Sequence, residues 1–252
     1  MNLLSDLYLS CVNLNFFKVK IHSCMSLELV TFFIILSFLT SLLTSVFSMG
    51  GGLIMLVALA QFFSPAILIP LHGSVQLTNN LSRVFVYRNF FRWNLIRNIL
   101  FPTIFGAFLA INLFGNLSEK ILLLLIAATI LFLTWAPSNH FLFSAMKNDL
   151  SCGFISGFAG IFVGANGPLV TACLRTKNLQ PEILIANHGA IMVFQHLIKI
   201  ILFASFFNFL ILDYIVFITL MTVSGYFGAV IAKRLIIKIS LSKFDLILKV
   251  LL

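Results

Sequence analysis

Long apolar stretches alternate with short polar segments along most of the chain. About 20 mostly apolar residues suffice to cross a bilayer, and backbone groups in lipid must be hydrogen-bonded within their own segment or barrel. The runs are continuous rather than alternating, which favours helices over the strands of a β-barrel. The pattern therefore predicts an all-α membrane protein, a polytopic transmembrane helical bundle. The predicted helical stretches are 27–48, 66–87, 95–114, 118–136, 149–173, 183–207 and 209–235, with a short one at 241–252.

One of these stretches occurs twice. Residues 65–73 read PAILIPLHG and residues 181–189 read PEILIANHG, an offset of 116 residues with most positions identical. Internal duplication is typical of membrane transporters, whose related halves meet at a shared site and contain broken helices. We therefore expect a first membrane repeat at 27–136 and a second at 149–252, with a short or truncated last helix. An irregular N-terminal head at 1–26, in which Met25 is an alternative start, and a linker at 137–148 complete the expected organisation.

Glycine-rich breaks interrupt two apolar stretches at matched positions. Glycine adopts almost any φ and proline lacks an amide donor, so a helix opens there. The helix that follows each break presents free N–H groups, which favour an anion. Close packing through small residues is the alternative explanation. We expect both breaks to face the substrate: Gly50, Gly51 and Gly52 in the first repeat, and Asn166, Gly167 and Pro168 in the second.

A polar stripe follows each repeated segment along one face of a helix. Polar side chains inside a membrane are costly and normally face a bundle interior or a wet cavity. Alternatively, the cations extend to the membrane interface and the amides join helices. We expect the stripes to line a pathway for a small anion, with their cations Arg83 and Lys199 attracting it at one mouth. The expected lining residues are His72, Gln76, Asn79, Arg83, His188, Gln195, His196 and Lys199.

The charge balance limits the partners and the chemistry. All seven acidic residues lie in the head, the tail or near the ends of apolar stretches, so no buried carboxylate is available as a proton or sodium carrier. Proton coupling through the histidines is left open. The net charge of +9 comes from clusters at helix ends, which is typical of membrane proteins and not of a nucleic-acid groove. We expect a small anionic substrate and the lipid bilayer as partners, with no metal and no cofactor, and leave the oligomeric state open.

Two other function classes stay open at this point. A pair formed by Ser156 and His188 would make the protein an intramembrane serine hydrolase, but His72 repeats the histidine without a matching serine. A non-transporting membrane assembly partner would depend on helix packing at Gly153 and Gly157. Transport explains the duplicated motifs more fully, so no catalytic residue is expected.

Several of these motifs resemble the sulfite exporter TauE/SafE family. They are SMGGG at 48–52, the segment 65–73 leading into a polar helix, RWN at 92–94 and the glycine-rich stretch 153–168, which ends in GANGP. The resemblance extends over about residues 27–240. It implies a multi-pass protein of the plasma (inner) membrane with duplicated halves, which exports sulfite or organosulfonate-type anions. It also implies that the glycine breaks lie near the substrate path.

Overall fold

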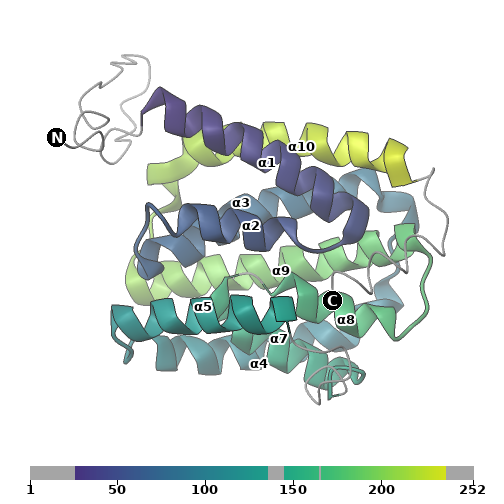
Figure 1. Cartoon of the computed structure of the whole chain (residues 1–252). Coiled ribbons are helices and arrows are strands. Elements are labelled where there is room, and N and C mark those ends of the chain that lie inside the picture. Colours follow the sequence, from purple (N-terminus) through teal and green to yellow (C-terminus); the bar gives the residue numbers. More distant parts are fainter. Residues whose placement is uncertain (1–25, 136–144, 165, 237–252) are drawn as a thin grey trace.

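The computed structural model describes residues 26–135, 145–164 and 166–236, and within them every regular element is a helix (Figure 1). The predicted all-α class is therefore confirmed. Most of the expected head, part of the linker and the short stretch 241–252 lie outside the described residues. The helices are α1 (Leu27–Phe47), α2 (Gly51–Leu59), α3 (Pro65–Val86), α4 (Arg97–Phe114), α5 (Glu119–Trp135), α7 (Asp149–Val163), α8 (Gly167–Arg175), α9 (Pro181–Phe207) and α10 (Ile215–Ile236), with short 3-10 turns at Arg88–Phe90, Trp93–Leu95 and Ile211–Tyr214.

Local sequence signals explain where these helices begin. The Ser26 hydroxyl accepts a hydrogen bond from the Leu29 N–H at 3.3 Å and so caps α1. Pro65 and Pro181 occupy the first positions of α3 and α9, where a missing N–H costs nothing. The predicted apolar stretches consequently agree with the observed helices to within a few residues at most ends.

Backbone turns separate α1 from α2 and α7 from α8. Ser48 and Gly50 adopt φ angles of 61° and 91° between the first pair, and Gly164 adopts 78° between the second. These left-handed conformations redirect the chain. Two of the three residues are glycines, which adopt positive φ readily because they lack a Cβ. The single stretch expected at 149–173 thus consists of two helices, and α2 and α8 are short helices of nine residues each.

The helices pack in three groups, with α3 and α9 together at the centre (Figure 1). On one side α1 lies along α10, and on the other α4 lies along α7 with α5 beside them. The hydroxyls of Ser37 and Ser41 in α1 donate to the carbonyl oxygens of Met221 and Gly225 in α10, at 2.8 and 2.7 Å. Small residues therefore let these backbones approach closely, as is common in membrane helix pairs.

The packing partners follow the 116-residue offset found in the sequence. A shift by 116 residues carries α1, α2, α3 and α4 approximately onto α7, α8, α9 and α10. The pair α1–α10 then corresponds to the pair α7–α4, and α3–α9 corresponds to itself. Two related halves that interlock about the centre of the bundle would produce this arrangement.

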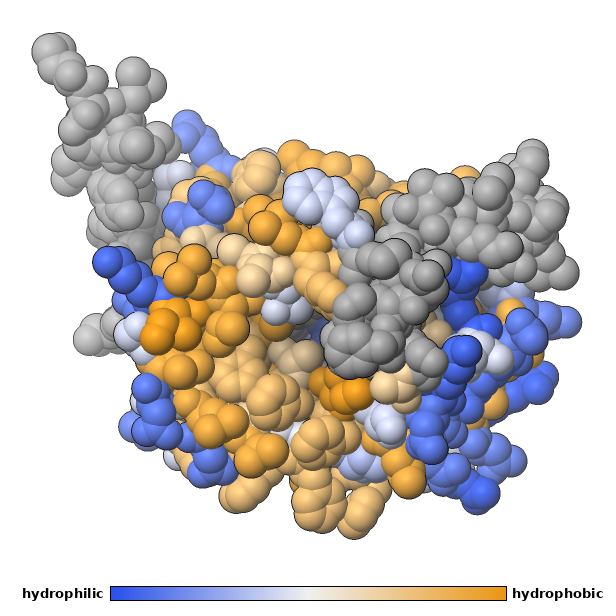
Figure 2. All heavy atoms as spheres, turned by 60° about the horizontal axis from the view of Figure 1, so that its bottom comes forward, coloured by the Kyte–Doolittle hydropathy of each residue, from blue (hydrophilic) through white to orange (hydrophobic). Residues whose placement is uncertain are grey.

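The exterior of the bundle is apolar. Four of the described segments are long and apolar enough to cross a membrane: α1, α4, α9 and Ile211–Ile236. Figure 2 shows a broad hydrophobic band on one face, with hydrophilic residues gathered toward its two ends. Phe101, Phe105 and Phe108 of α4 are each more than half exposed. An apolar belt with polar ends is the surface expected of a protein embedded in lipid.

Candidate functional site

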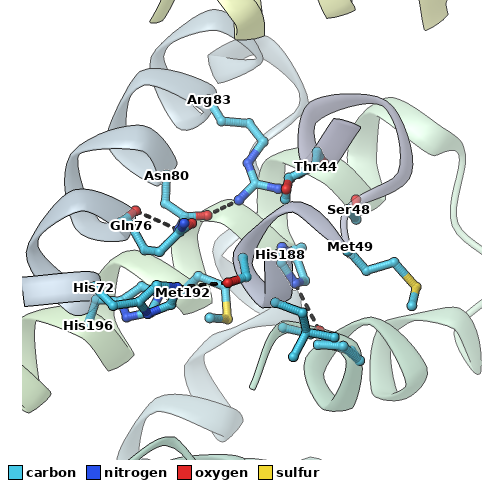
Figure 3. Close-up of a pocket in the computed structure, with 15 residues that line it drawn as sticks. Thr44, Ser48, Met49, His72, Gln76, Asn80, Arg83, His188, Met192 and His196 are labelled. Atoms are coloured by element: carbon cyan, nitrogen blue, oxygen red, sulfur yellow. Dashed lines mark hydrogen bonds between the residues drawn. The ribbon is translucent and has the colours of Figure 1, made fainter. Parts of the chain in front are cut away.

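A small cavity lies between the two glycine breaks and the central helices α3 and α9 (Figure 3). Its volume is about 30 Å³, room for about one or two water molecules. The polar stripes of α3 and α9 face it, so residues more than 100 positions apart meet here. Of the residues expected from the sequence at the substrate site, those around the cavity are Gly50, Gly52, His72, Gln76, Arg83, Gly167, Pro168, His188 and His196.

The two histidines of the duplicated motif each bind the glycine break that precedes them in the chain. His72 Nε2 lies 2.9 Å from the carbonyl oxygen of Gly52, and His188 Nε2 lies 3.1 Å from that of Gly167. A carbonyl can only accept, so both Nε2 atoms carry the proton and donate. Both rings are buried, and among the described residues neither Nδ1 atom has a partner. The histidines thus hold the break residues in place and leave one polar atom each without a hydrogen bond.

Arg83 is the permanent charge at the cavity. Its guanidinium donates to the carbonyl oxygen of Thr44, in the last turn of α1, at 3.1 Å and also to Asn80 Oδ1 (Figure 3). The residue is only 3% exposed. Within the described ranges the one ion pair joins Lys177 to Asp149, and it does not involve this arginine. A buried charge normally needs a counter-charge, and here two neutral acceptors replace it.

Lys199 of α9 is buried just beyond the cavity wall. It is 2% exposed, and its Nζ donates to the carbonyl oxygen of Gly164 at 2.7 Å. The same Nζ lies 3.4 Å from Nδ1 of His196, which itself lines the cavity. Arg83 and Lys199 therefore lie inside the bundle and not at an exposed mouth, because helix-end carbonyls hold both.

The remaining expected residues contact other helices instead of the cavity. Gln195 Nε2 donates to Ser156 Oγ at 2.7 Å, and its Oε1 accepts from Asn166 Nδ2. Asn79 Nδ2 donates to Ser37 Oγ at 3.3 Å. Gly51 packs against Thr40 of α1. Gly51, Asn79, Asn166 and Gln195 thus join helices, which is the alternative explanation given above for the amides of the stripe.

Ser156 and His188 do not form a catalytic pair. Ser156 Oγ donates to the carbonyl oxygen of Cys152 at 2.6 Å and accepts from Gln195, whereas His188 binds Gly167. A nucleophilic serine needs its base in contact, so this geometry does not support the hydrolase alternative.

Gly153 and Gly157 pack within the chain. A Cβ at position 153 would overlap the carbonyl oxygen of Ile99, and one at position 157 would press on Thr103. These glycines are therefore occupied by α4 and are not free to receive an assembly partner. Within the described part of the chain, no group of three or more His, Cys, Asp or Glu residues could hold a metal ion.

Several residues at the cavity were not expected from the sequence. Ser48 is fully buried between α1 and α2, and its hydroxyl has no partner among the described residues. Its position two residues before the first break was the available signal. Met192 replaces Gln76 in the second stripe, so an apolar side chain covers the matching position. Thr44, Met49 and Leu53 also line the cavity. Asn80 lines it too, as a member of the polar stripe that the sequence predicts for α3.

Comparison with known proteins confirms the resemblance found in the sequence. The family model described as sulfite exporter TauE/SafE matches residues 33–252. No curated protein and no solved structure matches the chain. The matched region begins within α1 and includes both breaks, both stripes and the cavity between them. The chain therefore belongs to the sulfite exporter TauE/SafE family, a family of membrane transporters for sulfite-type anions.

Proposed function

We propose that this protein exports sulfite or an organosulfonate-type anion across the plasma (inner) membrane, and that the anion binds in the central cavity beside Arg83. The observation that carries this proposal is the buried guanidinium. It donates to neutral acceptors, and within the described residues it forms no ion pair with a carboxylate. A transported oxyanion would supply the counter-charge that the protein itself omits.

The chemistry of the lining suits an oxyanion. Arginine presents a planar fork of N–H donors that matches the oxygens of a carboxylate, phosphate or similar group. The short helices α2 and α8 begin at Gly51 and Gly167, so their N-terminal ends lie at the cavity. Free N–H groups and the positive end of the helix dipole favour negative charge there. Thus both a charged side chain and two helix ends attract the same kind of ligand.

The direction of transport follows from the membrane potential. An inside-negative potential drives an anion outward, by about 2.3 kcal/mol per charge per 100 mV. No intramembrane carboxylate among the described residues opposes this movement. Export is therefore the downhill direction for a sulfur oxyanion produced inside the cell.

Transport requires the cavity to widen. A sulfite ion is larger than a space that holds about one or two water molecules. Thr171 Oγ1 of α8 donates to the carbonyl oxygen of Ser48 at 3.1 Å, so a hydrogen bond joins α8 to the turn between α1 and α2 beside the cavity. Movement of the half 149–252 against the half 27–136 would separate the two breaks, which is the usual mode of alternating access in duplicated transporters.

The test is sulfite flux into proteoliposomes that contain the purified full chain, with and without an imposed potential. Arg83→Gln should lower kcat/KM at least tenfold, a loss of about 1.4 kcal/mol or more of stabilisation. Arg88→Gln is the matched control, because Arg88 lies in an exposed turn after α3. Saturable flux that Arg83→Gln leaves at the wild-type level would contradict the binding site. Stably folded wild-type protein without any saturable flux would contradict the substrate class.

A further inference from the structure

Arg83 and Lys199 occupy equivalent positions in the two halves, 116 residues apart. Each donates to a carbonyl oxygen at the C-terminal end of the first helix of its own half. For Arg83 this oxygen belongs to Thr44 of α1, at 3.1 Å, and for Lys199 it belongs to Gly164 after α7, at 2.7 Å. The C-terminal end of a helix carries partial negative charge and so favours a cation.

The neighbours of these two cations also correspond. Asn80 lies one turn before Arg83 and accepts a hydrogen bond from it. His196 stands at the equivalent position before Lys199, with its Nδ1 3.4 Å from the lysine Nζ. Both Asn80 and His196 line the cavity. The two halves therefore present a related arrangement, in which a helix end holds a cation and an acceptor one turn earlier lines the cavity.

The two arrangements differ in whether they can exchange a proton. Arginine stays charged in proteins, and an asparagine amide does not titrate. A lysine ammonium and a histidine imidazole can both release and take up a proton, and burial makes lysine readily able to do so. The first half thus carries a fixed charge where the second half carries an exchangeable proton.

We propose that Lys199 and His196 form a proton-binding site, and that the protein moves a proton together with its anion. This inference rests on the proposed transport function. The site takes up a proton from hydronium on one side, so that an N–H bond forms as an O–H bond breaks, and it returns the proton to water on the other side, where the N–H bond breaks and an O–H bond forms. Lys199 and His196 then act as the coupling site, whereas Arg83 binds the anion.

The surroundings of the site fit this role. The charged or titratable groups that act on His196 are Lys199, His72, His188 and Arg83. The His72 and His196 rings meet edge to face at 6.2 Å, and a Cβ added to Gly164 would lie 3.6 Å from His72 Nδ1. On the other elements that pack against α9, the described charged or titratable groups lie at or near helix ends: Glu28, Arg88, Arg97, Asp149, Cys152, Cys173 and Arg175.

Electrostatics sets the direction of coupling. A proton on this site adds positive charge beside the cavity, and an anion adds negative charge, so each favours binding of the other. For a divalent anion, Arg83 balances one charge and the protonated site balances the second. With both the anion and the proton bound, the site carries almost no net charge. This lowers the free energy needed to hold the anion in the low-dielectric interior of the bundle. Proton and anion consequently travel in the same direction.

The test gives the second half the residues of the first. In proteoliposomes, sulfite flux and internal pH are recorded together for wild type and for the double variant Lys199→Arg, His196→Asn. The proton-to-sulfite ratio of the variant should fall by about one, and a pH gradient alone should no longer drive sulfite against its gradient. Because hydrogensulfite brings a proton of its own, the two proteins are also compared with an organosulfonate, which carries no proton near neutral pH, and the same fall in the ratio is expected. The ratio does not depend on how much flux the variant retains.

Two further variants complete the experiment. Lys233→Arg is the matched control, because Lys233 also donates to a backbone carbonyl, that of Val86, but lies at the end of α10. It should keep the wild-type ratio. If the double variant does not fold, His196→Asn alone retains the Lys199–Gly164 bond and should still lower the ratio. An unchanged ratio overturns the coupling and leaves transport standing, whereas no saturable sulfite flux from folded wild type overturns transport itself.

Discussion

Gly51, the first residue of α2, lies so close to the carbonyl oxygen of Thr40 in α1 that a Cβ at position 51 would overlap it. Its counterpart in the second half, Gly167, has more room. A Cβ at position 167 would meet only the ring of His188, at an ordinary distance of 3.6 Å. Two glycines at matched positions thus serve different needs, close helix packing in one half and a small cavity wall in the other.

Gly51→Ala should therefore destabilise the protein, by about 1–3 kcal/mol, because a backbone atom must shift to admit the methyl group. Gly167→Ala should leave the melting temperature in detergent close to that of wild type. Its effect should appear as a higher KM for sulfite, since the methyl group narrows the cavity. Equal melting temperatures for the two variants would show that position 51 accommodates a methyl group as readily as position 167, which would contradict this prediction.

Ser48→Ala should separate binding from stability. The Ser48 hydroxyl is buried at the cavity without a partner among the described residues, so its removal should change the free energy of unfolding by less than about 1 kcal/mol. A hydrogen bond to a charged ligand is worth about 1.5–3 kcal/mol, so KM for sulfite should rise about tenfold or more. Ser82→Ala is the control, because that hydroxyl donates within α3 to the Thr78 carbonyl. A KM equal to that of wild type would remove Ser48 from the binding site.

The histidines should tolerate glutamine better than alanine. Glutamine Nε2 can replace the imidazole Nε2 that donates to Gly167, whereas alanine leaves that carbonyl without its donor. We expect His188→Ala to lower kcat/KM for sulfite about tenfold and His188→Gln to retain most of it, with folded protein in both cases. The same pair of variants at His72 should behave alike, since His72 binds Gly52 in the same way. Wild-type flux in both alanine variants would exclude the histidines from the site.

Gln195→Met should weaken the fold more than it changes transport. The substitution leaves Asn166 and Ser156 without their partner in a buried network, at a cost of about 1–3 kcal/mol. KM for sulfite should stay within about threefold of wild type, because Gln195 does not line the cavity. Gln61→Met is the control, since Gln61 is exposed in the turn after α2. A large rise in KM with unchanged stability would instead place Gln195 on the substrate path.

The helices could be predicted from the sequence because their signals are local. Continuous apolar runs, the prolines at the starts of α3 and α9 and the glycines near both breaks all act within a few residues. The duplicated segment also indicated which helices correspond. No local signal predicts the direction that the chain takes after a break. That direction brings Thr44 and Ser48 to the cavity.

The candidate site could be predicted in outline only. The spacing places His72 and His188 on the polar faces of α3 and α9, because a shared helix face is a property of spacing. The polar face of each helix is wide, however, and the packing of the neighbouring helices determines which of its residues line the cavity. Asn79 and Gln195 therefore contact α1 and α7, whereas Asn80 and His196, one residue further along, turn toward the cavity.

The size of the cavity has a consequence for the speed of the protein. A channel needs a continuous wet path, and its ions pass without waiting for the protein to rearrange. Here the space between the breaks holds about one or two water molecules, and Thr171 of α8 bonds to Ser48 at its wall. Every turnover must therefore include a collective motion of helices, which takes microseconds to milliseconds. Under the proposed function, the protein should work as a carrier with saturable, strongly temperature-dependent kinetics, and the ion should exchange its hydration shell for Arg83 and the helix ends.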